Sequence, residues 1–107
     1  MKGVAGWIFQ RVTGVILIAG LILHFSTMHF SGPSQTTFDF VIRRLSNPYW
    51  KAFDICFLVT MLYHGFNGLW GIALEYISSL KLLRLSQTLI VGMVLLLLAT
   101  GVYIITL

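Results

Sequence analysis

Three long apolar runs with very few charges most limit the fold of this chain. They cover about residues 7–31, 49–77 and 86–107. At roughly 1.5 Å per helical residue, each run is long enough to cross a hydrocarbon layer about 30 Å thick. Backbone groups in lipid must bond within their own segment, so such runs fold as helices. The sequence predicts an all-α membrane protein, a single domain over residues 1–107 with three transmembrane helices.

The composition supports a membrane location and argues against nucleic-acid binding. Only 9% of the 107 residues are charged, against about 25% in an ordinary soluble domain. The net charge is +4, but the basic residues lie at the ends of the apolar runs and form no solvent-facing patch. We also find no Gly-rich phosphate loop, Cys-x-x-Cys pair or Ser/His/Asp grouping. In an enzyme complex, the catalytic core would therefore lie in other chains.

The basic residues also predict an orientation in the membrane. Four lie on one side of the predicted spans and three on the other: Lys2, Arg11, Lys81 and Arg84 against Arg43, Arg44 and Lys51. Positive residues favour the inner side. We expect the N-terminus inside and the C-terminus outside, in a bacterial or archaeal cytoplasmic membrane or the mitochondrial inner membrane.

The segments between the runs are short. The first run is expected to end at Ser31-Gly32-Pro33, and Asn47-Pro48 precedes the second. Between them, four apolar residues recur at helical spacing: Phe38, Val41, Ile42 and Leu45. This pattern predicts a short interfacial helix, with Ser34 or Thr36 as a candidate cap. A second loop is expected to begin at Ser78 and to contain Lys81 and Arg84.

The second run places His64 near mid-membrane, where an ionisable side chain is costly and usually functional. At about 100° per residue, His64 shares a stripe with Gly68, Gly71 and Glu75, each within about 40° of His64. Two glycines remove side chains where a flat ligand would approach. The alternative is helix contact through small residues, with His64 bonded to a neighbouring helix.

The first run carries a second histidine in a similar setting. Thr13, Gly20 and His24 share one helical face, whereas His29 lies nearer the far interface and suits a headgroup, a propionate or a loop carbonyl. Imidazole is the usual neutral iron ligand, and two imidazoles give a six-coordinate haem suited to electron transfer. His64 and His24 are therefore the candidate ligands of a haem iron, with Gly68 and Gly71 beside the cofactor.

Residue counts predict two polar layers. Arg11 lies thirteen residues from His24, and Tyr76 lies twelve from His64, so each separation is about 18–20 Å along a helix. We therefore expect Arg11, Glu75 and Tyr76 near the inner surface and both histidines deeper. The three polar groups offer donors and a proton route for a quinone. In the alternative, Arg11 snorkels to the interface and Tyr76 is an aromatic belt residue.

Two segments carry a family resemblance. Residues 10–14 (Gln-Arg-Val-Thr-Gly) followed by His24, and residues 63–71 (Tyr-His-Gly-Phe-Asn-Gly-Leu-Trp-Gly) followed by Glu75-Tyr76, resemble the small membrane-anchor subunits of succinate dehydrogenase. The closing Glu-Tyr pair is most similar to the D-type anchor. The resemblance implies a complex that passes electrons from succinate, through a flavoprotein subunit and an iron–sulfur subunit, to quinone. It also implies a second three-helix anchor as partner.

The resemblance also implies roles for individual residues. His64 matches the axial ligand of haem b, and His24 matches the first-span ligand of dihaem anchors. Tyr76 would donate a hydrogen bond to quinone, with Glu75 orienting neighbours or passing protons. Arg11 would stabilise quinone anion or a haem propionate. One or two haems remain open, because single-haem D-type anchors lack a first-span ligand and the dihaem anchor lacks the Glu-Tyr ending.

The type of quinone and the direction of the reaction, succinate oxidation or fumarate reduction, stay open as well. Two other functions compete with this interpretation. One is a b-type cytochrome anchor of another respiratory complex, such as a hydrogenase or a formate dehydrogenase. The other is a haem-free helical membrane protein, either a small transporter or an assembly protein.

Overall fold

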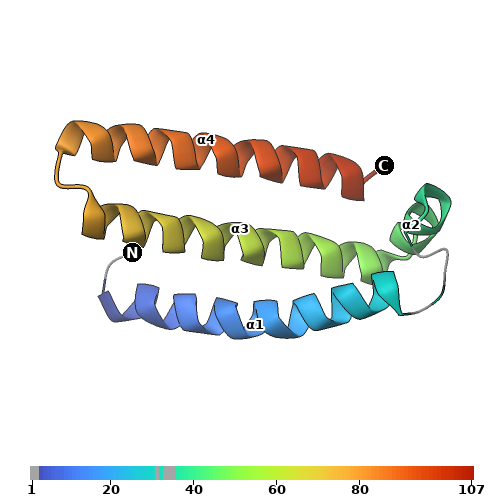
Figure 1. The fold of residues 1–107 in the computed structure, drawn as a ribbon. Coiled ribbons are helices and arrows are strands. Elements are labelled where there is room, and N and C mark those ends of the chain that lie inside the picture. Colours follow the sequence, from blue (N-terminus) through green and yellow to red (C-terminus); the bar gives the residue numbers. More distant parts are fainter. Residues whose placement is uncertain (1–2, 31, 33–35) are drawn as a thin grey trace.

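The computed structural model describes residues 3–30, 32 and 36–107, and every regular element in them is a helix. In chain order the helices are α1 (Gly3–His29), α2 (Phe38–Leu45), α3 (Pro48–Tyr76) and α4 (Leu80–Ile105) (Figure 1). The three long ones are apolar and long enough to cross a membrane. The predicted all-α fold, with three spans and a short helix in the first loop, is confirmed.

The short helix α2 is amphipathic, as the spacing of its apolar residues predicts. Its N-cap is Thr37, whose hydroxyl accepts a hydrogen bond from the Phe40 backbone N–H at 3.4 Å. Thr36 is therefore not the cap, and Ser34 lies outside the described residues. Of the predicted end of the first span, Ser31 and Pro33 also lie outside them.

The boundaries of the other helices follow local capping chemistry. Asn47 caps α3 by accepting from the Tyr49 N–H at 2.9 Å, and Pro48 occupies the first helical position, where it costs no hydrogen bond. Helix α4 begins at Leu80 and not near residue 86, because Ser79 caps it. Lys81 and Arg84 therefore lie in the first turns of α4, and the prediction that they lie in a loop is wrong.

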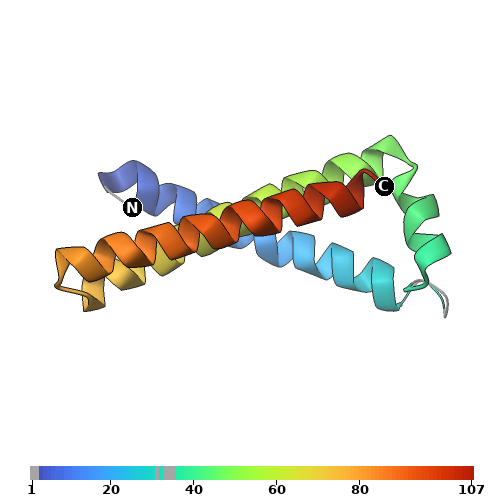
Figure 2. The same cartoon turned by 90° about the horizontal axis from the view of Figure 1, so that it is seen from above.

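Helix α3 lies between α1 and α4 and packs against both (Figure 1). Seen from above, α1 crosses α3 like one arm of an X, whereas α4 follows α3 closely (Figure 2). Glycines permit both contacts. A Cβ added at Gly20 of α1 would lie 2.8 Å from the Phe57 ring, and one at Gly101 of α4 would lie 2.5 Å from Leu58.

Little of the chain is buried by its own packing. The buried apolar residues among those described are Leu45, Leu62, Ala73 and Ile105. Most of the remaining large apolar side chains are exposed along the three long helices. Such surfaces are stable where they meet lipid or the helices of a partner chain.

Candidate functional site

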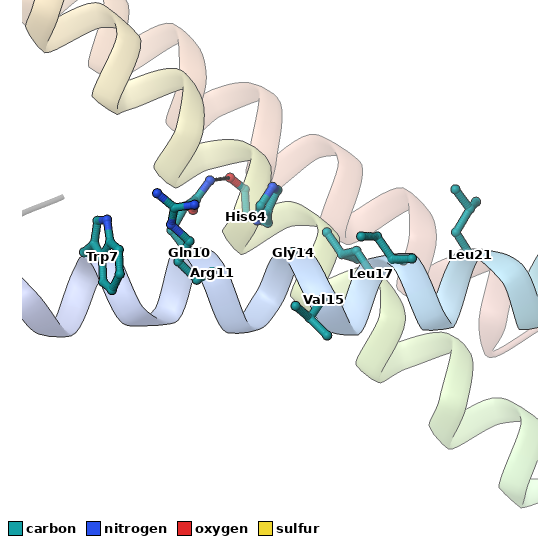
Figure 3. Close-up of a pocket in the computed structure, with 9 residues that line it drawn as sticks. Trp7, Gln10, Arg11, Gly14, Val15, Leu17, Leu21 and His64 are labelled. Atoms are coloured by element: carbon teal, nitrogen blue, oxygen red, sulfur yellow. Dashed lines mark hydrogen bonds between the residues drawn. The ribbon is translucent and has the colours of Figure 1, made fainter.

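His64 of α3 faces α1 close to the point where the two helices cross. Its ring nitrogen Nδ1 lies 3.0 Å from the hydroxyl oxygen of Thr13. A Cβ added at Gly14, the next residue of α1, would lie 3.4 Å from Cε1 of the same ring. The imidazole therefore rests against the Thr-Gly pair of α1 (Figure 3 shows His64 over Gly14).

The partners of Thr13 decide which nitrogen of His64 carries the proton. The Thr13 hydroxyl has one proton and three acceptors within reach: the Phe9 carbonyl at 2.7 Å, the Gln10 carbonyl at 3.1 Å and His64 Nδ1 at 3.0 Å. With the proton on a carbonyl, Nδ1 of a neutral imidazole carries the ring hydrogen and Nε2 keeps its lone pair; with the proton toward Nδ1, the ring hydrogen is on Nε2. The shorter contact, to Phe9, favours the first arrangement, in which Nε2 is the nitrogen that a metal would use.

A second polar contact fixes α3 against α1 beside His64. Asn67, only 7% exposed, donates from Nδ2 to the Gln10 side-chain oxygen at 2.9 Å. The Gln10 amide nitrogen donates in turn to the backbone carbonyl of His64 at 3.4 Å (dashed in Figure 3). A Cβ at Gly68 would lie 3.3 Å from that amide nitrogen. Gly68 therefore makes room for Gln10. Thr13 contacts the ring of His64 and Gln10 bonds its backbone, so both residues help to position His64.

His64 borders a groove of about 770 Å³ that runs along α1. Its polar lining is Gln10, Arg11 and His64, and the rest is Trp7, Gly14 and four aliphatic residues: Val15, Leu17, Ile18 and Leu21 (Figure 3). The Arg11 guanidinium lies 4.9 Å from the centre of the Trp7 ring, an attractive cation–π arrangement. The groove therefore combines an apolar wall, a held imidazole and a cation.

These contacts overturn the predicted layers. Thr13 lies level with His64, so Arg11 is less than one turn away from that level and not about 18 Å from it. His24 lies eleven residues beyond Thr13, about 16 Å further along α1. The predicted common depth of the two histidines is wrong. Residue counts along each helix did not reveal how α1 is registered against α3. In addition, α1 begins at Gly3 and not near residue 7, so Arg11 lies further inside the helix than predicted.

The predicted quinone residues are also separated. Glu75 and Tyr76 are exposed at the C-terminal end of α3, where Tyr76 is 78% exposed. Neither lines the groove of Arg11 and His64. Gly71 has no atom of another element near its missing Cβ and faces open space, unlike Gly68. The structure thus brings Arg11 to the His64 groove and leaves Gly71, Glu75 and Tyr76 apart from it. Gly68 packs against Gln10 and does not line the groove, so the predicted place of both glycines beside the cofactor is not met.

His24 lies in a different groove, of about 420 Å³, which is bordered by α1, α3 and α4 and contains Asp54. The ring centres of His24 and Phe57 are 5.7 Å apart. Nδ1 of His24 is buried without a hydrogen-bond partner among the described residues. Of the groove-lining residues, only Leu21 is shared with the His64 groove.

Asp54 also takes part in a buried ion pair, which sequence reasoning missed. Arg44 of α2 donates from Nη2 to Oδ2 of Asp54 at 3.3 Å, and the two side chains are only 6% and 10% exposed. The guanidinium also lies 5.2 Å from the Trp50 ring centre. An acidic residue inside an apolar run was a signal for a nearby cation. Asn67, one turn from His64, was a similar signal for a polar contact between spans.

Within the described residues, no three His, Cys, Asp or Glu side chains gather to hold a bare metal ion. A lone imidazole suits a metal whose remaining ligands come from elsewhere, as in a porphyrin.

Comparison with known proteins identifies the family. The family model for the succinate dehydrogenase/fumarate reductase transmembrane subunit matches residues 1–102. This chain belongs to that family. The sequence-based resemblance to succinate dehydrogenase membrane anchors is confirmed, and the three apolar helices long enough to span a membrane agree with a transmembrane subunit.

Two relatives are named succinate dehydrogenase hydrophobic membrane anchor subunits. The protein of Thermoplasma acidophilum is 41% identical over 61 residues, which cover 56% of this chain and 50% of that protein. The protein of Archaeoglobus fulgidus is 30% identical over 69 residues, or 64% of this chain and 59% of that protein. The matched residues thus span about half to three-fifths of the length of each relative.

Proposed function

We propose that this chain is a membrane-anchor subunit of a succinate:quinone oxidoreductase, that it holds haem b together with a partner anchor, and that it forms part of the quinone site. The observation that carries the proposal is the position of His64. Its Nδ1 contacts the Thr13 hydroxyl, so Nε2 is the ring nitrogen left for a metal, beside a groove that also contains Arg11. Family membership supports the same function.

The residues of the groove suit haem b. Aliphatic side chains and Trp7 form an apolar wall for a macrocycle, and Gly14 leaves the edge of the imidazole uncovered. Arg11 supplies a cation for a propionate or a reduced quinone. When bound, the haem would accept and release single electrons between the iron–sulfur subunit and quinone. The contributions of this chain are to orient His64, to exclude water with the apolar wall, and to balance negative charge with Arg11.

His24 bears on whether one or two haems are present. With about 16 Å between their levels on α1, His64 and His24 cannot both ligate one iron, whose ligand nitrogens lie about 2 Å away. His24 would therefore serve a second haem or none. A metal-bound histidine usually donates from its other nitrogen, and Nδ1 of His24 has no such partner among the described residues. A buried ring nitrogen without a partner is also what a second iron would need, so one haem or two stays open and the haem stoichiometry of the complex decides it.

The quinone proposal rests on two separate places. Arg11 and Trp7 lie in the His64 groove, whereas Glu75 and Tyr76 are exposed at the end of α3. Exposed groups at a helix end can complete a site only together with another chain. We therefore expect the second three-helix anchor or the iron–sulfur subunit to cover Glu75 and Tyr76, on the side of the membrane where the N-terminus lies.

Gentle purification of the intact complex tests this function. We expect the chain to co-purify with a flavoprotein, an iron–sulfur subunit and a second anchor, and succinate to reduce a b-type haem in the spectrum. A haem-bearing complex without a succinate-oxidising flavoprotein would favour another respiratory b-type anchor. A colourless membrane fraction would contradict the haem proposal and favour a haem-free transporter or assembly protein.

A further inference from the structure

We propose that Thr13 is a positioning residue that fixes the tautomer of His64 and, through it, lowers the reduction potential of the haem iron. The inference rests on the proposed haem site and assigns a role to a residue that does not itself contact the cofactor. The observations behind it are the 3.0 Å contact between Thr13 Oγ1 and His64 Nδ1 and the shorter, 2.7 Å contact of the same hydroxyl with the Phe9 carbonyl, which competes for its proton.

The acceptor is fixed by the backbone of α1. The Thr13 hydroxyl lies 2.7 Å from the Phe9 carbonyl and 3.1 Å from the Gln10 carbonyl, both in the preceding turn. Both carbonyls can only accept, and the Phe9 contact is the shortest that the hydroxyl makes, so we assign the hydroxyl proton to a carbonyl and not to Nδ1 of His64. The oxygen lone pair left over points to His64. Because Gly14 follows directly, the imidazole can approach α1 closely enough for this bond.

The bond has a consequence for the iron. An acceptor at Nδ1–H draws the proton away from the ring and makes Nε2 a more basic ligand. A more basic ligand stabilises ferric iron more than ferrous iron, which lowers the reduction potential. Gln10 bonds only the backbone carbonyl of His64, so it holds the helix without affecting the ring in this way.

The first test compares Thr13→Val, which nearly keeps the shape and removes the acceptor, with Thr13→Ser, which keeps a hydroxyl. The matched control is Thr27→Val, because Thr27 also bonds a carbonyl of its own helix, at 2.8 Å, and lies outside the His64 groove. In redox titrations of the purified complex, we expect the midpoint potential of haem b to rise in Thr13→Val and to stay unchanged in the other two. An unchanged potential in Thr13→Val would overturn the proposal.

The second test does not require haem. Nitrogen NMR of the full chain in detergent, with labelled histidine and with His64→Gln to assign the signals, reports which ring nitrogen is protonated. We expect His64 to carry its proton on Nδ1 in the wild-type chain and in Thr13→Ser, and to shift toward the Nε2 form in Thr13→Val. A proton on Nε2 in the wild-type chain would refute the role of Thr13.

The two proposals fail in different ways. A wild-type complex without haem b contradicts the proposed function, while the NMR measurement still decides whether Thr13 sets the tautomer. A complex with haem b and an Nε2-protonated or Thr13-insensitive His64 contradicts the positioning role alone. If Thr13→Val does not assemble, the wild-type and Thr13→Ser spectra still decide.

Discussion

The two histidines that share α1–α3 packing differ in how their polar surroundings are arranged. Around His64 the polar groups form a connected set of hydrogen bonds: Thr13 contacts Nδ1, Gln10 bonds the backbone carbonyl of His64, and Asn67 bonds Gln10. Around His24, by contrast, several buried atoms have no partner among the described residues, including His24 Nδ1 and Asp54 Oδ1. In the first arrangement, Nε2 of His64 is the ring nitrogen left for a ligand. The second surrounds an ion pair that joins two helices.

This difference separates a site from a structural contact. A network whose members are all satisfied except for one acceptor holds that acceptor ready for a partner. A buried ion pair whose other polar atoms have no partner has a large desolvation cost. It adds little net stability, but removing one member leaves the other charge buried and unpaired. The Arg44–Asp54 pair connects α2 to α3, so we interpret it as a structural contact that holds the first loop against α3.

The largest expected effect on stability comes from breaking the Arg44–Asp54 ion pair. Asp54→Ala leaves the Arg44 charge buried and unpaired, which costs about 3–5 kcal/mol. Thermal unfolding of the detergent-solubilised complex should show a lower Tm, while haem b in the folded fraction keeps its spectrum. Asp39→Ala is the matched control, because Asp39 is exposed on α2. A Tm equal to that of the Asp39 variant would show that the pair does not stabilise the contact between the first loop and α3.

A smaller loss is expected on the other side of the comparison. Asn67→Leu removes the bond to Gln10 and leaves a partly buried acceptor, the Gln10 side-chain oxygen, without this partner, at a cost of about 1 kcal/mol. Because Gln10 also holds the His64 carbonyl, the haem b spectrum should broaden along with the loss of stability. Thr60→Val, which removes a hydroxyl bonded within α3, should change neither. A destabilised variant with an unaltered haem spectrum would separate the Gln10–Asn67 contact from the site.

The smallest effect concerns the exposed end of α3. Tyr76→Phe removes one hydroxyl donor, and we expect quinone reduction to slow by roughly fivefold, a loss of about 1 kcal/mol of transition-state stabilisation. Reduction of an artificial dye by succinate should be unchanged. Tyr49→Phe serves as control, since Tyr49 is exposed at the opposite end of the same helix. Equal rates in both variants would remove Tyr76 from the quinone site.

Sequence reasoning reached the fold and the position of His64 for clear physical reasons. Apolar runs with few charges allow little other than membrane helices, and an isolated histidine at mid-span stands out against them. The short helix α2 followed from the spacing of its apolar residues. These features depend on neighbours within one segment.

The features that sequence reasoning missed all depend on contacts between segments. The register of α1 against α3 is set where Gly14 and Gly20 let side chains of α3 approach, and residue counts along separate helices contain no information about it. The same holds for the Arg44–Asp54 pair, which joins two helices, and for the Gln10–Asn67 bond. The early start of α4 was the exception, because the Ser79 cap was visible in the sequence.

Ligation by His64 is the central claim, and chemical rescue tests it most directly. His64→Gly removes the imidazole and leaves a space beside Thr13 that free imidazole can enter. His29→Gly is the matched control, because His29 is an exposed histidine of α1 outside both grooves. We predict that His64→Gly loses the haem b absorption, that added imidazole restores it, and that His29→Gly retains it throughout. A His64→Gly complex with unchanged haem b absorption and no response to imidazole would contradict the account.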